Sequence, residues 1–146
     1  MKHLITIISL LMLLSSCCGS QTDNSADKFG LTSAELSALL VPVELYIESG
    51  VKGTSECAKR AFVPQATMSH VEADSIVVAP IQALYDFYDQ TGPQDCSYEL
   101  ADCSVAGDAA MVRIESVFGE ARFTDMFTML KQGGEWKIVS KIFTVK

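Results

Sequence analysis

The last third of the chain, residues 97–146, alternates apolar and polar positions in four segments. The dipeptides Gly107-Asp108, Gly119-Glu120 and Gly133-Gly134 separate these segments. Each dipeptide suits a two-residue hairpin turn, because glycine readily adopts the positive φ that such turns require. The pattern therefore predicts a four-stranded antiparallel meander, whose turns fix which residues lie opposite each other.

Counting outward from the turns predicts one apolar face of the meander. Gly119-Glu120 places Ile114 opposite Asp125, and Gly133-Gly134 places Asp125 opposite Ile142. Residues directly opposite share a face, so both turns assign Asp125 to the same surface. The residues predicted for this face are Val112, Ile114, Ser116, Phe118, Phe123, Asp125, Phe127, Met129, Trp136, Ile138, Ser140 and Ile142. The opposite, mixed face is predicted to carry Arg113, Glu115, Thr124, Met126, Thr128, Lys137, Val139, Lys141 and Phe143.

The first half of the chain predicts helices and two more strands. Thr32 followed by Glu35 makes a capping box, and apolar residues then recur at helical spacing as far as Val51. Pro42 interrupts this run, so we expect a kink there, or a short turn before a main helix that begins at Pro42. We expect further elements as a helix at 55–62, strands at 66–71 and 75–79, and a helix at 80–88. This order indicates an α+β fold.

The start of the chain is typical of a targeting segment. Lys2 precedes an apolar run from Leu4 to Leu14, which would rise only about 16 Å as a helix, against about 30 Å for a hydrocarbon core. Leu14-Ser15-Ser16-Cys17 resembles the lipobox of bacterial lipoproteins, in which the cysteine is lipidated. We expect a signal peptide at 1–16 and a lipid anchor on Cys17 with a flexible tether at 17–30. These would hold a domain at 31–146 in the bacterial cell envelope; an ordinary secretory signal is the alternative.

Charge and residue counts limit the classes of partner. The formal net charge of -7 argues against nucleic acid and against electrostatic binding to anionic lipid, so we expect membrane contact only through the lipid anchor. His70 would be the single histidine after processing, and no glycine-rich phosphate loop is present, so no metal and no cofactor is expected. Cys96 and Cys103 flank one predicted strand and would lie about 23 Å apart, beyond the reach of a disulfide. A bridge from Cys57 to either of them stays open.

Several segments carry a family resemblance. They are Tyr46-Ile47-Glu48-Ser49-Gly50, Lys59-Arg60-Ala61-Phe62-Val63-Pro64-Gln65-Ala66, Gly107-Asp108-Ala109-Ala110, Phe123-Thr124-Asp125 and Gly134-Glu135-Trp136-Lys137-Ile138-Val139-Ser140-Lys141-Ile142-Phe143. On these segments the chain resembles the nuclear transport factor 2-like (NTF2-like) superfamily, and within it the bacterial "putative lumazine-binding" group, from Ser33 to Phe143. It departs from that group where Val63 and Gln65 replace the usual histidine and aspartate around Pro64.

The resemblance implies a cone-shaped α+β fold, in which a curved antiparallel sheet wraps the N-terminal helices and leaves a pocket between them. The apolar face of the meander would line this cone, and the mixed face would form a homodimer interface. The pocket would bind a small apolar molecule or a peptide. The expected ligand-binding residues are Tyr46, Tyr85, Ile114, Asp125, Phe127 and Ser140.

Three residues are candidates for acid–base chemistry. Burial of Asp125 would favour its neutral form, which can donate a hydrogen bond to a developing oxyanion. Tyr46 is similar to a tyrosine at a comparable helix end of ketosteroid isomerases, and the segment that ends at His70 is similar to a run that ends in their basic aspartate. His70 could then abstract a proton near neutral pH. The alternatives are a structural aspartate bonded to a tyrosine hydroxyl or backbone amide, a tyrosine that only packs, and an exposed histidine at a strand end.

Two functions follow from these candidates. The first is a non-enzymatic, lipid-anchored binding module. The second is a small-molecule isomerase, dehydratase or hydrolase that uses Asp125, Tyr46 and His70 as acid and base. Convergence of these three side chains in one water-excluded pocket would favour the enzyme.

Overall fold

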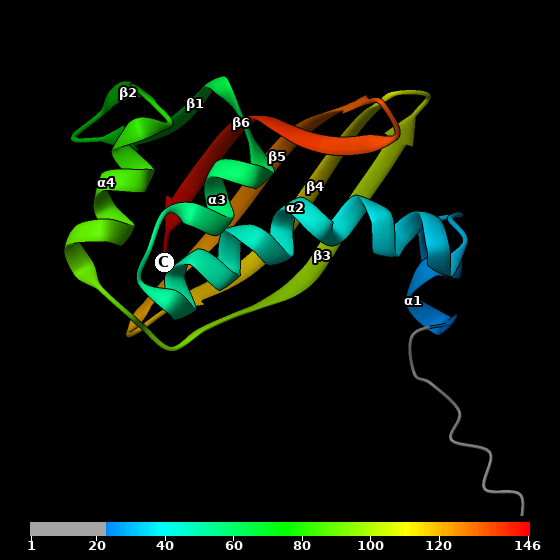
Figure 1. Ribbon diagram of the computed structural model, residues 1–146, viewed down its shortest axis with the longest axis horizontal. Helices are drawn as coiled ribbons and strands as arrows, with labels where there is room; N and C mark the ends of the chain where they lie inside the picture. The colour runs from blue at the N-terminus through cyan, green and yellow to red at the C-terminus, as the bar shows by residue number, and fades with distance from the viewer. Residues whose placement is uncertain (1–22) are drawn as a thin grey trace, which may run out of the picture.

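The computed structural model describes residues 23–146, which form four helices and one six-stranded sheet (Figure 1). The sheet is curved and unclosed, with strand order β2-β1-β6-β5-β4-β3. All neighbouring strands are antiparallel except β1 and β6. The elements are α1 (Asp23–Lys28), α2 (Ser33–Lys52), α3 (Glu56–Ala61), β1 (Phe62–Glu72), β2 (Ser75–Pro80), α4 (Gln82–Thr91), β3 (Cys96–Ala106), β4 (Ala109–Phe118), β5 (Ala121–Gln132) and β6 (Glu135–Val145).

The helices cover one face of the sheet. In Figure 1, α2 and α3 lie across that face, α4 lies beside β2 at one end, and α1 lies at the other end. The core sits between α2 and the sheet, where Leu39, Val43, Ile114 and Ile138 are fully buried. The predicted α+β order and the cone-like fold are therefore confirmed.

The main helix runs without interruption past its proline. Thr32 and Glu35 form the predicted capping box, and Gly53 ends the helix with a φ of 64°. Pro42 lies inside α2 and is buried, so the expected short turn before it is absent. Burial against the core compensates for the backbone hydrogen bond that a proline cannot donate.

The start of the described chain differs from the expected tether. Asp23–Lys28 forms α1, and Ala26 within it is only 1% exposed. The Leu31 backbone N–H donates to the Ala26 carbonyl across Gly30, whose φ is 67°. The predicted signal peptide and lipid anchor lie outside the described residues. In residues 23–146 no helix is long and apolar enough to cross a membrane, and Cys57, Cys96 and Cys103 are free thiols.

The β4–β5 hairpin has the predicted register along its whole length. Phe118 pairs with Ala121 beside the turn, and Ile114 pairs with Asp125 in the middle. Gly119 has a φ of 59°, as its place at the first position of the turn requires. Asp125 therefore lies on the face that α2 covers.

The β5–β6 hairpin follows the predicted register only as far as Ile138. Met129 pairs with Ile138, but Thr128 pairs with Ser140, which leaves Val139 unpaired in a β-bulge. The bulge shifts the rest of β6 by one residue, and a one-residue shift turns every following side chain to the opposite face.

The predicted faces of the second half of β6 were consequently wrong. Asp125 pairs with Phe143 and Phe127 pairs with Lys141, not with Ile142 and Ser140 as predicted. Lys141 and Phe143 thus belong to the inner face, while Ser140 and Ile142 share the outer face with Thr128 and Met126. The strand β1 also changes register here, between Phe62 and Thr67, so both neighbours of β6 accommodate the bulge.

Candidate ligand site around Lys141 and Asp125

Asp125 is completely buried (0% exposed), and each of its two carboxylate oxygens has a polar partner. Its Oδ2 accepts hydrogen bonds from the Ser116 hydroxyl at 2.6 Å and from the Tyr46 hydroxyl at 3.2 Å. Its Oδ1 lies 2.7 Å from Nζ of Lys141. Of the ion pairs among the described residues, only Lys141–Asp125 has both side chains buried. A buried pair is tolerated only if its geometry is close and further hydrogen bonds satisfy its polar atoms.

Lys141 is the buried cation that the bulge brings inside. Its side chain is 4% exposed, and Nζ lies 3.9 Å from the ring centroid of Phe143 and 5.5 Å from that of Tyr46. Burial lowers the pKa of Lys141, and the neighbouring Asp125 carboxylate opposes this effect only in part. The ammonium is therefore easier to deprotonate than that of a lysine in water.

A cavity of about 200 Å³ lies directly beside this lysine. Strands β1, β4, β5 and β6 and helices α2 and α4 contribute its walls. Lys141 is its only charged wall residue; Asp125 does not line it and lies behind Tyr46 and Lys141. The lining residues are Tyr46, Met68, Leu84, Phe87, Tyr88, Phe118, Phe123, Lys141 and Phe143.

The two buried tyrosines at this cavity use their hydroxyls within the protein. Tyr88 donates to the backbone carbonyl of Tyr46 at 2.9 Å, and Tyr46 donates to Asp125. Burial raises the pKa of both tyrosines well above its usual value. Tyr46 therefore serves as a hydrogen-bond donor that holds the Asp125 carboxylate in place.

His70 does not join Tyr46 and Asp125 in the cavity. It lies on β1, and its ring stacks on Phe143 with centroids 4.7 Å apart. Its Nδ1 is buried without a hydrogen-bond partner among the described residues, and its Nε2 lies 4.0 Å from Glu72. Of the three predicted acid–base residues, the structure thus brings two together and leaves the third behind the Phe143 ring.

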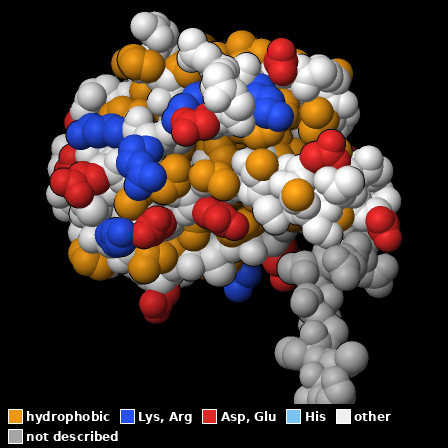
Figure 2. All heavy atoms as spheres, turned by 45° about the vertical axis from the view of Figure 1, so that its right-hand side comes forward, with side chains coloured by type: hydrophobic (Ala, Val, Ile, Leu, Met, Phe, Trp, Pro, Cys, Tyr) orange, Lys and Arg blue, Asp and Glu red, His pale blue; other side chains and the backbone are white. Residues whose placement is uncertain are grey.

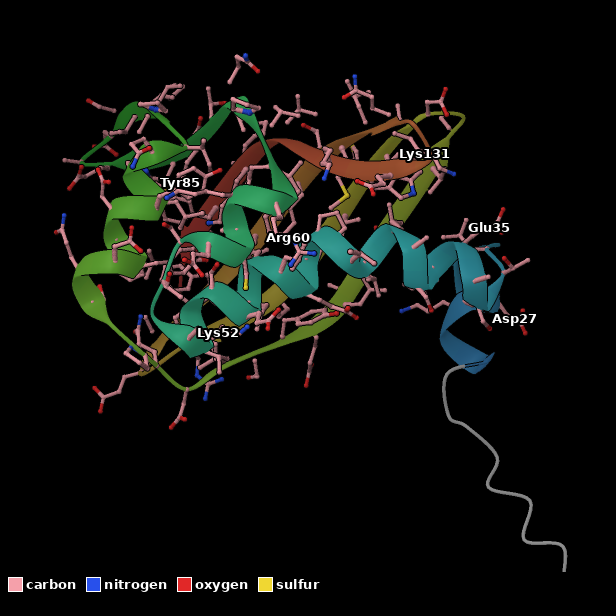
Figure 3. All side chains as sticks on the ribbon, viewed as in Figure 1. Asp27, Glu35, Lys52, Arg60, Tyr85 and Lys131 are labelled. Carbon is pink, nitrogen blue, oxygen red and sulfur yellow. The ribbon has the colours of Figure 1, made fainter. Side chains whose placement is uncertain are left out.

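The other predicted ligand-binding residues do not line this cavity. Ile114 and Phe127 are buried in the core, and Ser140 lies on the outer face because of the bulge. Tyr85 lies on α4, at the end of the sheet far from Lys131 (Figure 3), and its ring faces the ammonium of Lys59. Sequence reasoning missed Lys141 and the cavity residues Met68, Leu84, Phe87 and Phe143. The one available signal was a lysine within the mostly apolar segment 138–143 of the last strand.

The described residues also form hollows outside this site. A larger one, of about 610 Å³, lies between α2, α3 and the β5–β6 turn, and another of about 260 Å³ lies on the outer face of the sheet. No buried ionisable group lines the larger one, and the Cys103 thiol is the only one that lines the smaller, so neither has a buried charged group in its wall. No cluster of possible metal ligands occurs in residues 23–146. Figure 2 shows acidic and basic side chains mixed with hydrophobic ones over the visible surface.

Known proteins share this fold, and some share about a third of the aligned residues. Residues 34–144 match the family described as "Putative lumazine-binding". The chain is 31% identical over 116 residues to Aldolase FrzH of Cladobotryum sp, which covers 77% of this chain and 93% of that protein. An NTF2-like protein of unknown function from Shewanella baltica OS155 superposes with a TM-score of 0.71 at 35% identity, covering 77% and 94% of the two chains. A ketosteroid isomerase-like protein from Erwinia carotovora atroseptica SCRI1043 superposes with a TM-score of 0.59 at 15% identity over 76% and 95%, which shows a common fold alone.

Proposed function

Because the chain belongs to the family described as "Putative lumazine-binding" and has the NTF2-like fold, we propose that it binds a small apolar carbonyl compound in the cavity beside Lys141. A ring would pack between the aromatic walls, and the carbonyl oxygen would accept a hydrogen bond from Nζ. The observation that carries this proposal is a single buried ammonium in the wall of an otherwise apolar cavity.

Charge selects a neutral ligand over an anion. The Asp125 carboxylate, 2.7 Å from Nζ, already neutralises the ammonium. A carboxylate ligand would therefore bring an uncompensated negative charge into an apolar site, which is costly. A carbonyl oxygen needs only a hydrogen-bond donor. The lysine ammonium has three N–H groups, so it can still donate to a ligand while it faces Oδ1 of Asp125.

Size limits the ligand to about one ring and a short substituent. An engineered cavity of about 150 Å³ in another protein holds benzene. The cavity here, at about 200 Å³, has room for one ring together with a carbonyl group. Acetophenone and benzaldehyde are therefore suitable probes.

Calorimetric titration tests this proposal. We expect acetophenone to bind more tightly than toluene, which lacks the oxygen, and more tightly than benzoate, which carries the charge. Met68→Trp should abolish binding because Met68 lines the cavity, whereas Met126→Trp, on the half-exposed outer face, should leave it unchanged. Unchanged binding by Met68→Trp would exclude this cavity as the site.

A second candidate is catalysis on such carbonyl compounds. Its support is the relative named an aldolase, together with the Tyr46, Asp125 and Lys141 cluster at one wall. Lys141 would stabilise negative charge that develops on the carbonyl oxygen, in place of the neutral carboxyl expected for ketosteroid-isomerase-type chemistry. Retro-aldol cleavage of 4-hydroxy-4-methylpentan-2-one, which is no larger than acetophenone, would support it if Lys141→Met abolished the reaction. Equal rates in the two proteins would exclude it.

The cellular setting in this proposal is a lipid anchor on Cys17 and a homodimer. The lipobox supports the anchor, and the exposed apolar side chains Met111, Met126 and Ile142 on the outer face support self-association. Cys17→Ala should release the protein from the membrane fraction. Met126→Asp should halve the mass measured by light scattering if the outer face forms the dimer.

A further inference from the structure

We propose that Lys141 forms a Schiff base with the carbonyl compound held in the cavity. This inference rests on the proposed function, since it requires the same ligand in the same place. It goes further in assigning a covalent bond to one named nitrogen.

Access from the cavity and apolar surroundings favour this lysine. It is the only amine that lines the cavity, and its side chain is 4% exposed, so a ligand would reach Nζ only from within the cavity. Six aromatic rings, the Leu84 side chain and the Met68 thioether form the rest of the wall. These apolar walls offer water few hydrogen-bonding partners, and hydrolysis of an imine needs water beside the C=N bond.

Asp125 is placed to exchange the proton that the reaction requires. Tyr46 and Ser116 both donate to Oδ2, which leaves Oδ1 to face Nζ of Lys141 without any hydrogen bond from another described residue. Nζ and Oδ1, 2.7 Å apart, are within direct proton-transfer distance. The lowered pKa of Lys141, caused by burial, makes the neutral amine more accessible.

The step balances without any further reactant. The ammonium gives one proton to Oδ1, and the neutral amine forms a bond to the carbonyl carbon. A second amine proton passes to the carbonyl oxygen, which yields a carbinolamine. Its hydroxyl then takes the proton back from Asp125 and leaves as water, and the C–O bond is replaced by a protonated C=N bond.

The charges explain why the product suits this site. Before the step an ammonium faces the Asp125 carboxylate, and after it a protonated imine faces the same carboxylate. The net charge of the buried pair is zero in both states, so no uncompensated charge is buried at the end. The same cationic nitrogen can withdraw electrons from an adjacent C–C or C–H bond.

Reductive trapping of the full domain tests the inference. Benzaldehyde and sodium cyanoborohydride are added near neutral pH, and peptide mass spectrometry locates each benzyl group. We expect benzylation of Lys141 at least tenfold faster than that of Lys137 and Lys146, which are matched controls on the same strand and at its end. Excess acetanilide, a poorly electrophilic carbonyl compound of similar shape, should block labelling of Lys141 and leave the other two lysines unaffected.

The outcomes separate this inference from the proposed function. If calorimetry shows that acetophenone binds but Lys141 is labelled no faster than Lys137, the Schiff base is excluded and the binding proposal stands. If no carbonyl compound binds and Lys141 is not labelled, both are excluded. Lys141→Arg should lose the fast label; should this variant not fold, competition by acetanilide in the unsubstituted protein decides the question alone.

Discussion

The two consecutive hairpins β4–β5 and β5–β6 begin alike and end differently. Each starts from a two-residue turn with glycine in a positive-φ conformation. The first keeps one register to its end, whereas the second gains an unpaired Val139 and shifts by one residue. The regular hairpin supplies Ser116 and Asp125, and the bulged hairpin supplies Lys141, so the buried ion pair forms only because the two hairpins differ.

The difference shows how one additional residue can change the chemistry of a cavity. In a regular β6, Ser140 and Ile142 would face α2, and the carboxylate of Asp125 would be buried with two hydroxyl donors and no cation. The bulge replaces these side chains with Lys141 and Phe143. β-Bulges are frequent near functional sites for this reason, since they redirect a side chain without a change of fold.

The largest effect should come from removing the cation that the bulged hairpin supplies. Lys141→Met leaves the Asp125 carboxylate buried without its partner, and removal of one member of a buried pair costs about 3–5 kcal/mol. Urea denaturation should show this loss in the free energy of unfolding. The double variant Lys141→Met/Asp125→Asn should recover most of it, because it buries no unpaired charge. Equal stability of the single and double variants would contradict a buried pair.

A smaller effect should distinguish the serines of the two hairpins. Ser116 on the regular hairpin donates to Asp125 at 2.6 Å, so Ser116→Ala should cost about 1–3 kcal/mol. Ser140, turned outward by the bulge, should cost less than about 0.5 kcal/mol as Ser140→Ala. Thermal and urea unfolding of both variants give the comparison. Similar losses at the two positions would mean that β6 has the regular register after all.

The smallest effect is on stability near pH 10, and it comes from Tyr46 and Tyr88, the buried tyrosines that α2 and α4 place against the two hairpins. Burial raises the pKa of Tyr46 and Tyr88, so the folded protein keeps protons that the unfolded chain loses above about pH 10. Stability should therefore fall as the pH rises above this value, by up to about 1.4 kcal/mol per pH unit for each tyrosine. The lowered pKa of Lys141 acts in the opposite direction, raising stability with pH, but only below about pH 10.5.

Melting temperatures between pH 8 and 12 measure this dependence. Tyr88→Phe removes one titrating hydroxyl and serves as the matched variant. It should be less stable at pH 8, where the bond to the Tyr46 carbonyl is lost, and should show a shallower alkaline decline. A decline as steep as that of the unsubstituted protein would mean that Tyr88 titrates normally.

Much of the fold could be predicted from local signals, and the cavity could not. The glycine dipeptides predict three turns, and the alternation of apolar residues predicts that Asp125 lies on the inner face. Both predictions succeed because they depend only on residues close together in the sequence. The bulge at Val139 has no such signal: it depends on β5 and β1 together, and β1 changes register beside it. Lys141 was therefore assigned to the outer face. The α4 residues Leu84 and Phe87 were missed because the β6 residues that line the cavity with them are distant in the sequence.

The cavity has two kinds of wall, and they can change separately. Lys141 and its partners come from the sheet and α2, whereas Leu84, Phe87 and Tyr88 come from the short helix α4. That helix is held by the Tyr88 bond to α2 and by Asp89, which accepts hydrogen bonds from the backbone and side chain of Ser55. Substitutions at Leu84 and Phe87 would leave these attachments intact. Substitutions on α4 could thus change the size of this cavity while the buried lysine on the sheet stays in place.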